Sequence, residues 1–157
     1  MLQHPMTLAG KQKLDDELNK LLKVDREEIK IAIAEAREHG DLKENAEYHA
    51  AKEKQSHIEG RIAELQGKIG AANVVDVSKI NSDKIVFGAT VTIFNVQKEE
   101  SMTVQIVGED EAQSEKGKIS YNSPLGKALI GKEEGDEAVV KAPKGDIEYE
   151  IEEVKYI

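Results

Sequence analysis

Two carboxylates, Asp41 and Glu44, stand three residues apart directly after Gly40. Carboxylate oxygens are hard ligands of the kind that Mg²⁺ prefers in proteins. Two of them are too few to hold an octahedral ion tightly, so water, phosphate or the carboxylates of another protein would have to complete the coordination shell. If this pair binds a metal ion, it therefore supplies half of a shared site.

The same spacing also has a purely structural explanation. An acid at a helix start, followed three residues later by Glu, is the pattern of a capping box. Asp41 would accept a hydrogen bond from the backbone of Glu44, and the Glu44 side chain would reach back to Asp41. Both charges would also suit the positive end of a helix dipole. Because helix starts are far more common than metal sites, the spacing alone favours capping.

Basic side chains flank the acid pair, and an aromatic residue follows it. The basic residues could form a solvated helix face with intrahelical ion pairs. They could instead form a small patch that contacts phosphates, and Arg37 and Lys52 are then the first candidates. Tyr48 could stack on a base, but its position in the first turns of a helix favours packing. The basic residues near the pair are Arg37, Lys43, Lys52 and Lys54.

Two long helices would place the acid pair. The first is expected over 7–38, with Thr7 as N-cap after Pro5 and with His39-Gly40 as its end. The second is expected to begin at about 41–44 and to end at about Gly70. A connection this short makes the helices antiparallel neighbours, and at 1.5 Å per residue the hairpin would extend roughly 45 Å.

Apolar residues recur at spacings of three, four and seven in both segments, which predicts a coiled-coil seam. Asp25 interrupts the first stripe where an apolar residue is expected. The seam is rich in Leu and Ile away from the connection and rich in Ala near it, so we expect a thin tip around 40–44. The seam residues are Leu14, Leu18, Leu22, Ile29, Ile33 and Ala36, and then Ile58, Ile62, Leu65, Ile69 and Ala72.

The second half of the chain alternates apolar and polar residues, with many β-branched residues, as strands do. A strand entry is expected at 73–77, a turn at 143–146 joins the last two strands, and a short helix is expected over 124–130 with Pro at its first position. The fold class is therefore α+β, with a helical hairpin domain at 1–75 and a small, mainly antiparallel sheet domain at 76–157. The expected sheet strands are 89–94, 102–107, 138–140 and 147–151.

Composition narrows the possible functions. The net charge of −9, most of it in residues 76–157, argues against a general nucleic-acid binder, which needs a basic face. Any contact with DNA or RNA must be local and guided by a protein partner. The absence of Cys excludes disulfides and Cys zinc sites. No segment has the apolar length of a signal or a membrane span, which predicts a cytoplasmic protein with no membrane partner.

The stretch 34–52, with the acid pair near its centre, resembles the tip signature of the Gre family of bacterial transcript-cleavage factors. The likeness continues at 5–8, at 86–91 and at 122–132. A match at several separate places over nearly the whole chain is highly specific. The sparse basic patch resembles the less basic branch of the family.

The resemblance implies a function and a role for each site residue. The finger would enter the secondary channel of bacterial RNA polymerase, where Asp41 and Glu44 help to hold the second Mg²⁺, shared with the polymerase. Arg37 and Lys52 would contact the 3′ end of the nascent RNA. An FKBP-like domain would dock at the channel rim through Asn122, Ser123 and Pro124. The protein would then be a monomeric cofactor of the polymerase's own RNA cleavage and no enzyme by itself.

Two other functions stay open. Relatives of this architecture occlude the channel without stimulating cleavage, and the presence of both acids argues weakly against this inhibitory role. The FKBP-like half also raises the possibility of a prolyl isomerase or chaperone. Four Tyr, two Phe and no Trp give little with which to line a proline pocket, so this third function is disfavoured.

Overall fold

The computed structural model describes residues 4–157. Its contacts divide these residues into two compact units. The first, here called the finger, is Lys11–Ala72, and the second, the sheet unit, joins residues 4–10 to Asn73–Ile157. This division differs from a single boundary between residues 75 and 76, because the first described residues pair with the strand that follows the finger.

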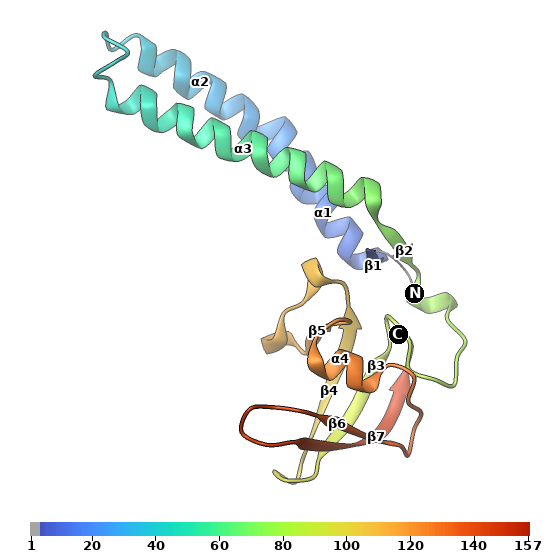
Figure 1. The fold of residues 1–157 in the computed structure, drawn as a ribbon. Coiled ribbons are helices and arrows are strands. Elements are labelled where there is room, and N and C mark those ends of the chain that lie inside the picture. Colours follow the sequence, from blue (N-terminus) through green and yellow to red (C-terminus); the bar gives the residue numbers. More distant parts are fainter. Residues whose placement is uncertain (1–3) are drawn as a thin grey trace. The chain divides into compact units, whose positions relative to one another are not determined.

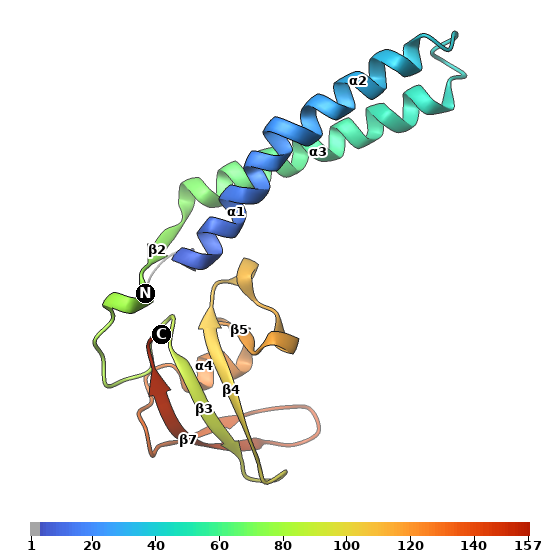
Figure 2. The same cartoon turned by 180° about the vertical axis from the view of Figure 1, so that it is seen from behind.

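The finger is a helical hairpin (Figure 1). One arm is a continuous helical path, and the other is the single helix α3, Ala46–Ala71. The two arms lie side by side in the opposite view as well (Figure 2). With 26 residues, α3 is roughly 39 Å long at 1.5 Å per residue, shorter than expected because it begins later in the chain. The first arm consists of α1 (Leu8–Lys20), η1 (Leu21–Asp25) and α2 (Arg26–Arg37).

The first arm is not one regular α-helix, because η1 is a π-helical turn. A π turn accommodates one extra residue and so shifts the helical register. It coincides with Asp25, which interrupts the apolar stripe. The structure buries Leu21, whereas the expected Leu22 is only half-buried. The half-buried Asp25 carboxylate lies 3.8 Å from the ammonium of Lys20.

Apolar packing and ion pairs hold the two arms together. Leu65 is fully buried, and burying one such side chain contributes roughly 1.5–3 kcal/mol. Arg61 of α3 donates to Glu17 at 2.7 Å, and Arg26 donates to Glu59 at 2.9 Å. Most of the expected seam is confirmed, although Leu18, Ile69 and Ala72 are only half-buried. The buried finger residues are Leu14, Leu21, Ile29, Ile33, Ala36, Ile58, Ile62 and Leu65.

The sheet unit contains five strands in the order β5-β4-β3-β7-β6. Neighbouring strands are antiparallel except for the parallel pair of β4 and β5. Alternate residues of β3, such as Val91 and Ile93, are fully buried, and Leu129 of the short helix α4 (Pro124–Leu129) packs into the same core. The strands are β3 (Thr90–Asn95), β4 (Glu100–Val107), β5 (Lys118–Ser120), β6 (Glu137–Val140) and β7 (Ile147–Lys155).

The predicted α+β class, the hairpin of β6 and β7, and the helix that starts at Pro124 are confirmed. The strands β5 and β1 (Pro5–Thr7) were not predicted, and neither was the pairing of β1 with β2 (Asn73–Val75) in a parallel two-stranded sheet. The strand entry expected at 73–77 ends at Val75, where a short 3₁₀ turn, Val77–Lys79, follows. Within residues 4–157, no helix has the length and apolar character that crossing a membrane requires.

Candidate functional site

The acid pair lies in the connection between α2 and α3, residues 38–45. The α2 helix ends at Arg37 with Glu38 as C-cap, one residue before the end expected at residue 38. Gly40 has φ of 112°, a conformation that side-chain-bearing residues rarely adopt. This glycine therefore serves the turn of the connection, one residue before Asp41.

The expected capping box is wrong. The α3 helix begins at Ala46, and its N-cap is Asn45, whose side-chain oxygen accepts from the backbone N–H of Tyr48 at 3.0 Å. Asp41 Oδ1 instead accepts from the N–H of Lys43 at 3.0 Å, a local turn contact. The carboxylate of Glu44 makes no hydrogen bond or ion pair with any residue from 4 to 157. Both acids are exposed, and neither caps the helix.

The two acids line one hollow at the tip of the finger. His39, Asn45, Ala46 and Glu47 line it with them, and the His39 ring lies 3.6 Å from the Glu47 carboxylate. In the part of the chain that the structure describes, no three His, Asp or Glu side chains are grouped closely enough to hold a metal ion. The tip thus offers hard oxygen ligands in a number that suits a shared site and not an independent one.

The basic candidates occupy different surroundings near the tip. The guanidinium carbon of Arg37 lies 5.7 Å from the centre of the Tyr48 ring, within range of a cation–π contact. Tyr48 is half-buried and also packs edge-on against His49, which agrees with its packing interpretation. Lys52 is exposed and donates to the neutral Gln55 side chain at 3.1 Å, so its positive charge is not neutralised by that partner.

The expected docking segment begins α4 in the sheet unit. Ser123 is the N-cap of this helix: its hydroxyl accepts from the N–H of Gly126 at 3.1 Å and donates to the carbonyl of Ser120 at 2.7 Å. Asn122 is exposed and donates to Glu109. Pro124 is exposed at the first helical position. Ser123 and Asn122 are therefore both held by hydrogen bonds within the sheet unit, and Asn122 and Pro124 are exposed to solvent.

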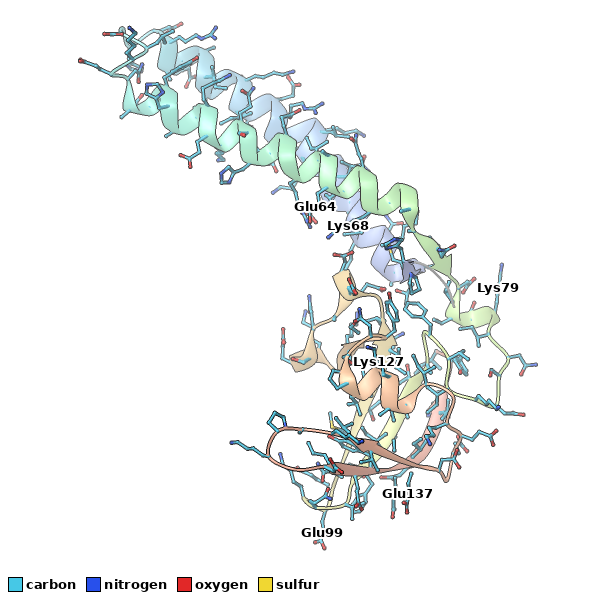
Figure 3. The ribbon with its side chains drawn as sticks, in the orientation of Figure 1. Glu64, Lys68, Lys79, Glu99, Lys127 and Glu137 are labelled. Atoms are coloured by element: carbon cyan, nitrogen blue, oxygen red, sulfur yellow. The ribbon has the colours of Figure 1, made fainter. Side chains whose placement is uncertain are left out.

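A largely apolar groove of the sheet unit borders this segment, as the composition of its lining shows. Phe87 and Tyr121 meet edge-on in it, with ring centres 5.9 Å apart. One cationic side chain, Lys127, whose position is labelled in Figure 3, also lines it. The lining residues are Pro5, Val75, Ile80, Val86, Phe87, Tyr121, Asn122, Lys127 and Ile130.

The fold and the tip together define a class of protein. Its members combine a two-helix finger, which has two exposed acids at its tip, with a small mixed sheet. Comparison with known families is specific. The family described as transcription elongation factor, N-terminal, matches residues 4–74, and that described as transcription elongation factor, GreA/GreB, C-term, matches residues 80–156. The chain belongs to the GreA/GreB family of transcription elongation factors, as its resemblance to the Gre family predicted.

Individual relatives agree over the full length. Transcription elongation factor GreA of Thioalkalivibrio sulfidiphilus (strain HL-EbGR7) is 57% identical over 158 residues, covering 100% of both chains. The protein of the same name from Hyphomonas neptunium (strain ATCC 15444) is 59% identical over 152 residues, 97% of each. Among solved structures, GreA factor homolog 1 (Gfh1) of Thermus thermophilus is 27% identical, with coverage of 96% and 97% and a TM-score of 0.42.

Proposed function

We propose that this chain binds bacterial RNA polymerase through its secondary channel and stimulates hydrolytic cleavage of the 3′ end of backtracked nascent RNA. It acts as a cofactor of the polymerase's own activity, as a monomer in the cytoplasm. One observation carries the proposal: Asp41 and Glu44 are exposed on the tip of a helical finger, and neither is used to cap the helix that follows.

The tip suits a divalent ion that is only partly held by another protein. Asp41 and Glu44 supply carboxylate oxygen ligands, and among residues 4–157 no group of three His, Asp or Glu side chains could hold a metal ion by itself. The remaining ligands of a Mg²⁺ would come from polymerase carboxylates, water and the RNA phosphate. When bound there, the ion would stabilise charge that develops on the phosphate and promote attack by water. The finger's contribution is to bring both carboxylates to the reacting phosphate together.

Other residues would hold the RNA and the partner. Arg37 and Lys52 are exposed on either side of the tip and can contact phosphates of the extruded RNA, since neither is paired with an acid in the described chain. Asn122 and Pro124 are open to solvent at the start of α4, beside the apolar groove. These features support docking of the sheet unit to a protein surface at the channel rim, with Ser123 shaping the segment.

The test is RNA cleavage by a stalled, backtracked complex of bacterial RNA polymerase, with and without the purified chain. The unmodified chain should accelerate release of a short 3′ fragment from end-labelled RNA. The double variant Asp41→Asn, Glu44→Gln should abolish this acceleration and still compete with the unmodified chain for polymerase. Its melting temperature should be unchanged, because neither carboxylate caps a helix.

A matched control removes two negative charges from the end of the first arm, close to the acid pair. Glu35 and Glu38 are exposed near the end of α2, and the double variant Glu35→Gln, Glu38→Gln should retain most of the stimulation. Acceleration that survives loss of Asp41 and Glu44 would refute metal delivery by the tip. Binding without acceleration by the unmodified chain would instead identify a channel-blocking inhibitor.

A further inference from the structure

The side chain of Asn45 uses both ends of its amide at the tip of the finger. Its oxygen accepts from the N–H of Tyr48 in the first turn of α3. Its nitrogen Nδ2 donates to the carbonyl of Ala36 in the last turn of α2 at 2.5 Å. One half-buried residue therefore joins the two helices across the connection that carries both acids.

The bond from Asn45 to Ala36 closes a ring that contains residues 37–44. Inside this ring, Asp41 contacts only the neighbouring N–H of Lys43, and Glu44 makes no bond within the described chain. Two further contacts reach the connection from α3. Nε2 of His49 lies 3.0 Å from the carbonyl of Lys43, so this nitrogen is the donor, and the His39 ring lies 3.6 Å from the exposed Glu47 carboxylate. The acids thus lie on an exposed segment, and the amide of Asn45 bonds to both helices that flank it.

We infer that Asn45 is a positioning residue for the acid pair: its bond to Ala36 holds Asp41 and Glu44 in the arrangement that binds the shared Mg²⁺. This inference rests on the proposed function. A flexible connection would have to be ordered each time the ion binds, whereas a closed ring has lost that freedom in advance. Binding of the ion by the tip is therefore stronger with the ring closed than with it open.

The competing explanation is that Asn45 only caps α3. Two substitutions can separate the cap to Tyr48 from the bond to Ala36. Ser caps helices about as well as Asn, but its hydroxyl is one bond shorter than the amide and falls short of Ala36. Asp also caps well and has no donor when ionised. The charge added by Asn45→Asp attracts Mg²⁺, so any weakening of Mg²⁺ binding in that variant has to come from the lost donor.

The experiment measures stimulated RNA cleavage by backtracked polymerase as a function of Mg²⁺ concentration. Groups that orient metal ligands typically contribute about 10- to 100-fold to metal affinity, so we expect Asn45→Ser to raise the half-saturating Mg²⁺ concentration about tenfold. Excess Mg²⁺ should restore the rate. Competition for polymerase and the melting temperature should match those of the unmodified chain, and Asn45→Asp should shift in the same direction.

An unchanged half-saturating Mg²⁺ concentration in Asn45→Ser would overturn the inference, and so would a loss of rate that Mg²⁺ does not restore. If Asn45→Ser melts early, Asn45→Asp decides the question in the same titration. Failure of the proposed function gives a different result. In that case the unmodified chain does not stimulate cleavage, or the Asp41→Asn, Glu44→Gln variant still does.

Discussion

Acidic side chains lie near the starts of two helices, α1 and α3, and they differ in how many hydrogen bonds they accept. In the sheet unit, the Glu111 carboxylate accepts from the backbone N–H of Thr7 and of Gly108, at 3.1 and 2.9 Å, and also from the Thr7 hydroxyl. That hydroxyl in turn accepts from the N–H of Gly10, which confirms Thr7 as the N-cap of α1. At the tip, by contrast, Asp41 has one local contact and Glu44 has none in the described chain.

The surroundings of Glu111 are shaped to receive it. A Cβ atom on Gly10 would lie 2.2 Å from the Glu111 side chain, and one on Gly108 would lie 2.6 Å from the carbonyl of Pro5. Only residues without a side chain leave room for this arrangement. The acid with a structural role is thus surrounded by donors, whereas the tip acids are exposed and have at most one local hydrogen bond in the described chain.

The largest expected effect is a slower rate of stimulated RNA cleavage when either Asp41 or Glu44 is replaced singly. Losing one direct metal ligand should cost at least the roughly 10- to 100-fold that groups supporting such ligands contribute. Asp41→Asn and Glu44→Gln should therefore each slow stimulated RNA cleavage by at least about tenfold, with melting unchanged. A lower melting temperature in either variant would show that the tip acids, like Glu111, stabilise the fold.

Glu111→Ala should produce the reverse pattern. It leaves the N–H groups of Thr7 and Gly108 without their acceptor, which typically costs about 1–3 kcal/mol for a buried donor. Thermal unfolding should show the loss, and hydrogen exchange at these two amides should accelerate. Glu115→Ala removes an exposed acid from the same connection between β4 and β5 and should change the free energy of unfolding by less than about 0.5 kcal/mol.

A smaller effect on stability is expected at Asn45, which both caps α3 and bonds to Ala36 beside the acid pair. Asn45→Ala removes the cap of α3, which costs about 1 kcal/mol, whereas Asn45→Ser should leave the free energy of unfolding nearly unchanged. Chemical denaturation followed by helical circular dichroism measures both. Equal destabilisation by the two substitutions would mean that the bond to Ala36 contributes more stability than the cap.

The smallest expected effect is on stability, from the ion pair between Glu17 of α1 and Arg61 of α3. The hydrogen bond from Arg61 is the main cause that lowers the pKa of Glu17. Because the folded-state pKa is lowered, the ion pair stabilises fully above the ordinary value of 4.5 and loses its contribution as the pH falls through the lower value. Both side chains of the pair are more than a third exposed, so solvent screens their attraction. Glu17→Gln should therefore cost less than about 1 kcal/mol at neutral pH, and less in high salt.

Contacts close in the sequence made much of the site predictable. The strings around Asp41 and Asn122 identify the family, and the position of Gly40 identifies the turn. The role of Asn45 was missed. The cap that Asn45 forms with Tyr48 could have been predicted, because an Asn directly before a helical segment is a local N-cap signal. The donor to Ala36 lies nine residues away across a turn and leaves no pattern in the sequence.

By itself, the sequence determined the hairpin, the alternating strands and the presence of two acids at the connection, because periodicity and turn residues act over a few neighbours. Tertiary structure alone decided that β1 pairs with β2 and that Leu21 is buried in place of Leu22 at the π turn. Each of these depends on a partner brought close by folding. That neither Asp41 nor Glu44 caps a helix follows from the competing cap at Asn45, where a local bond to Tyr48 is joined by a bond to Ala36 across the turn.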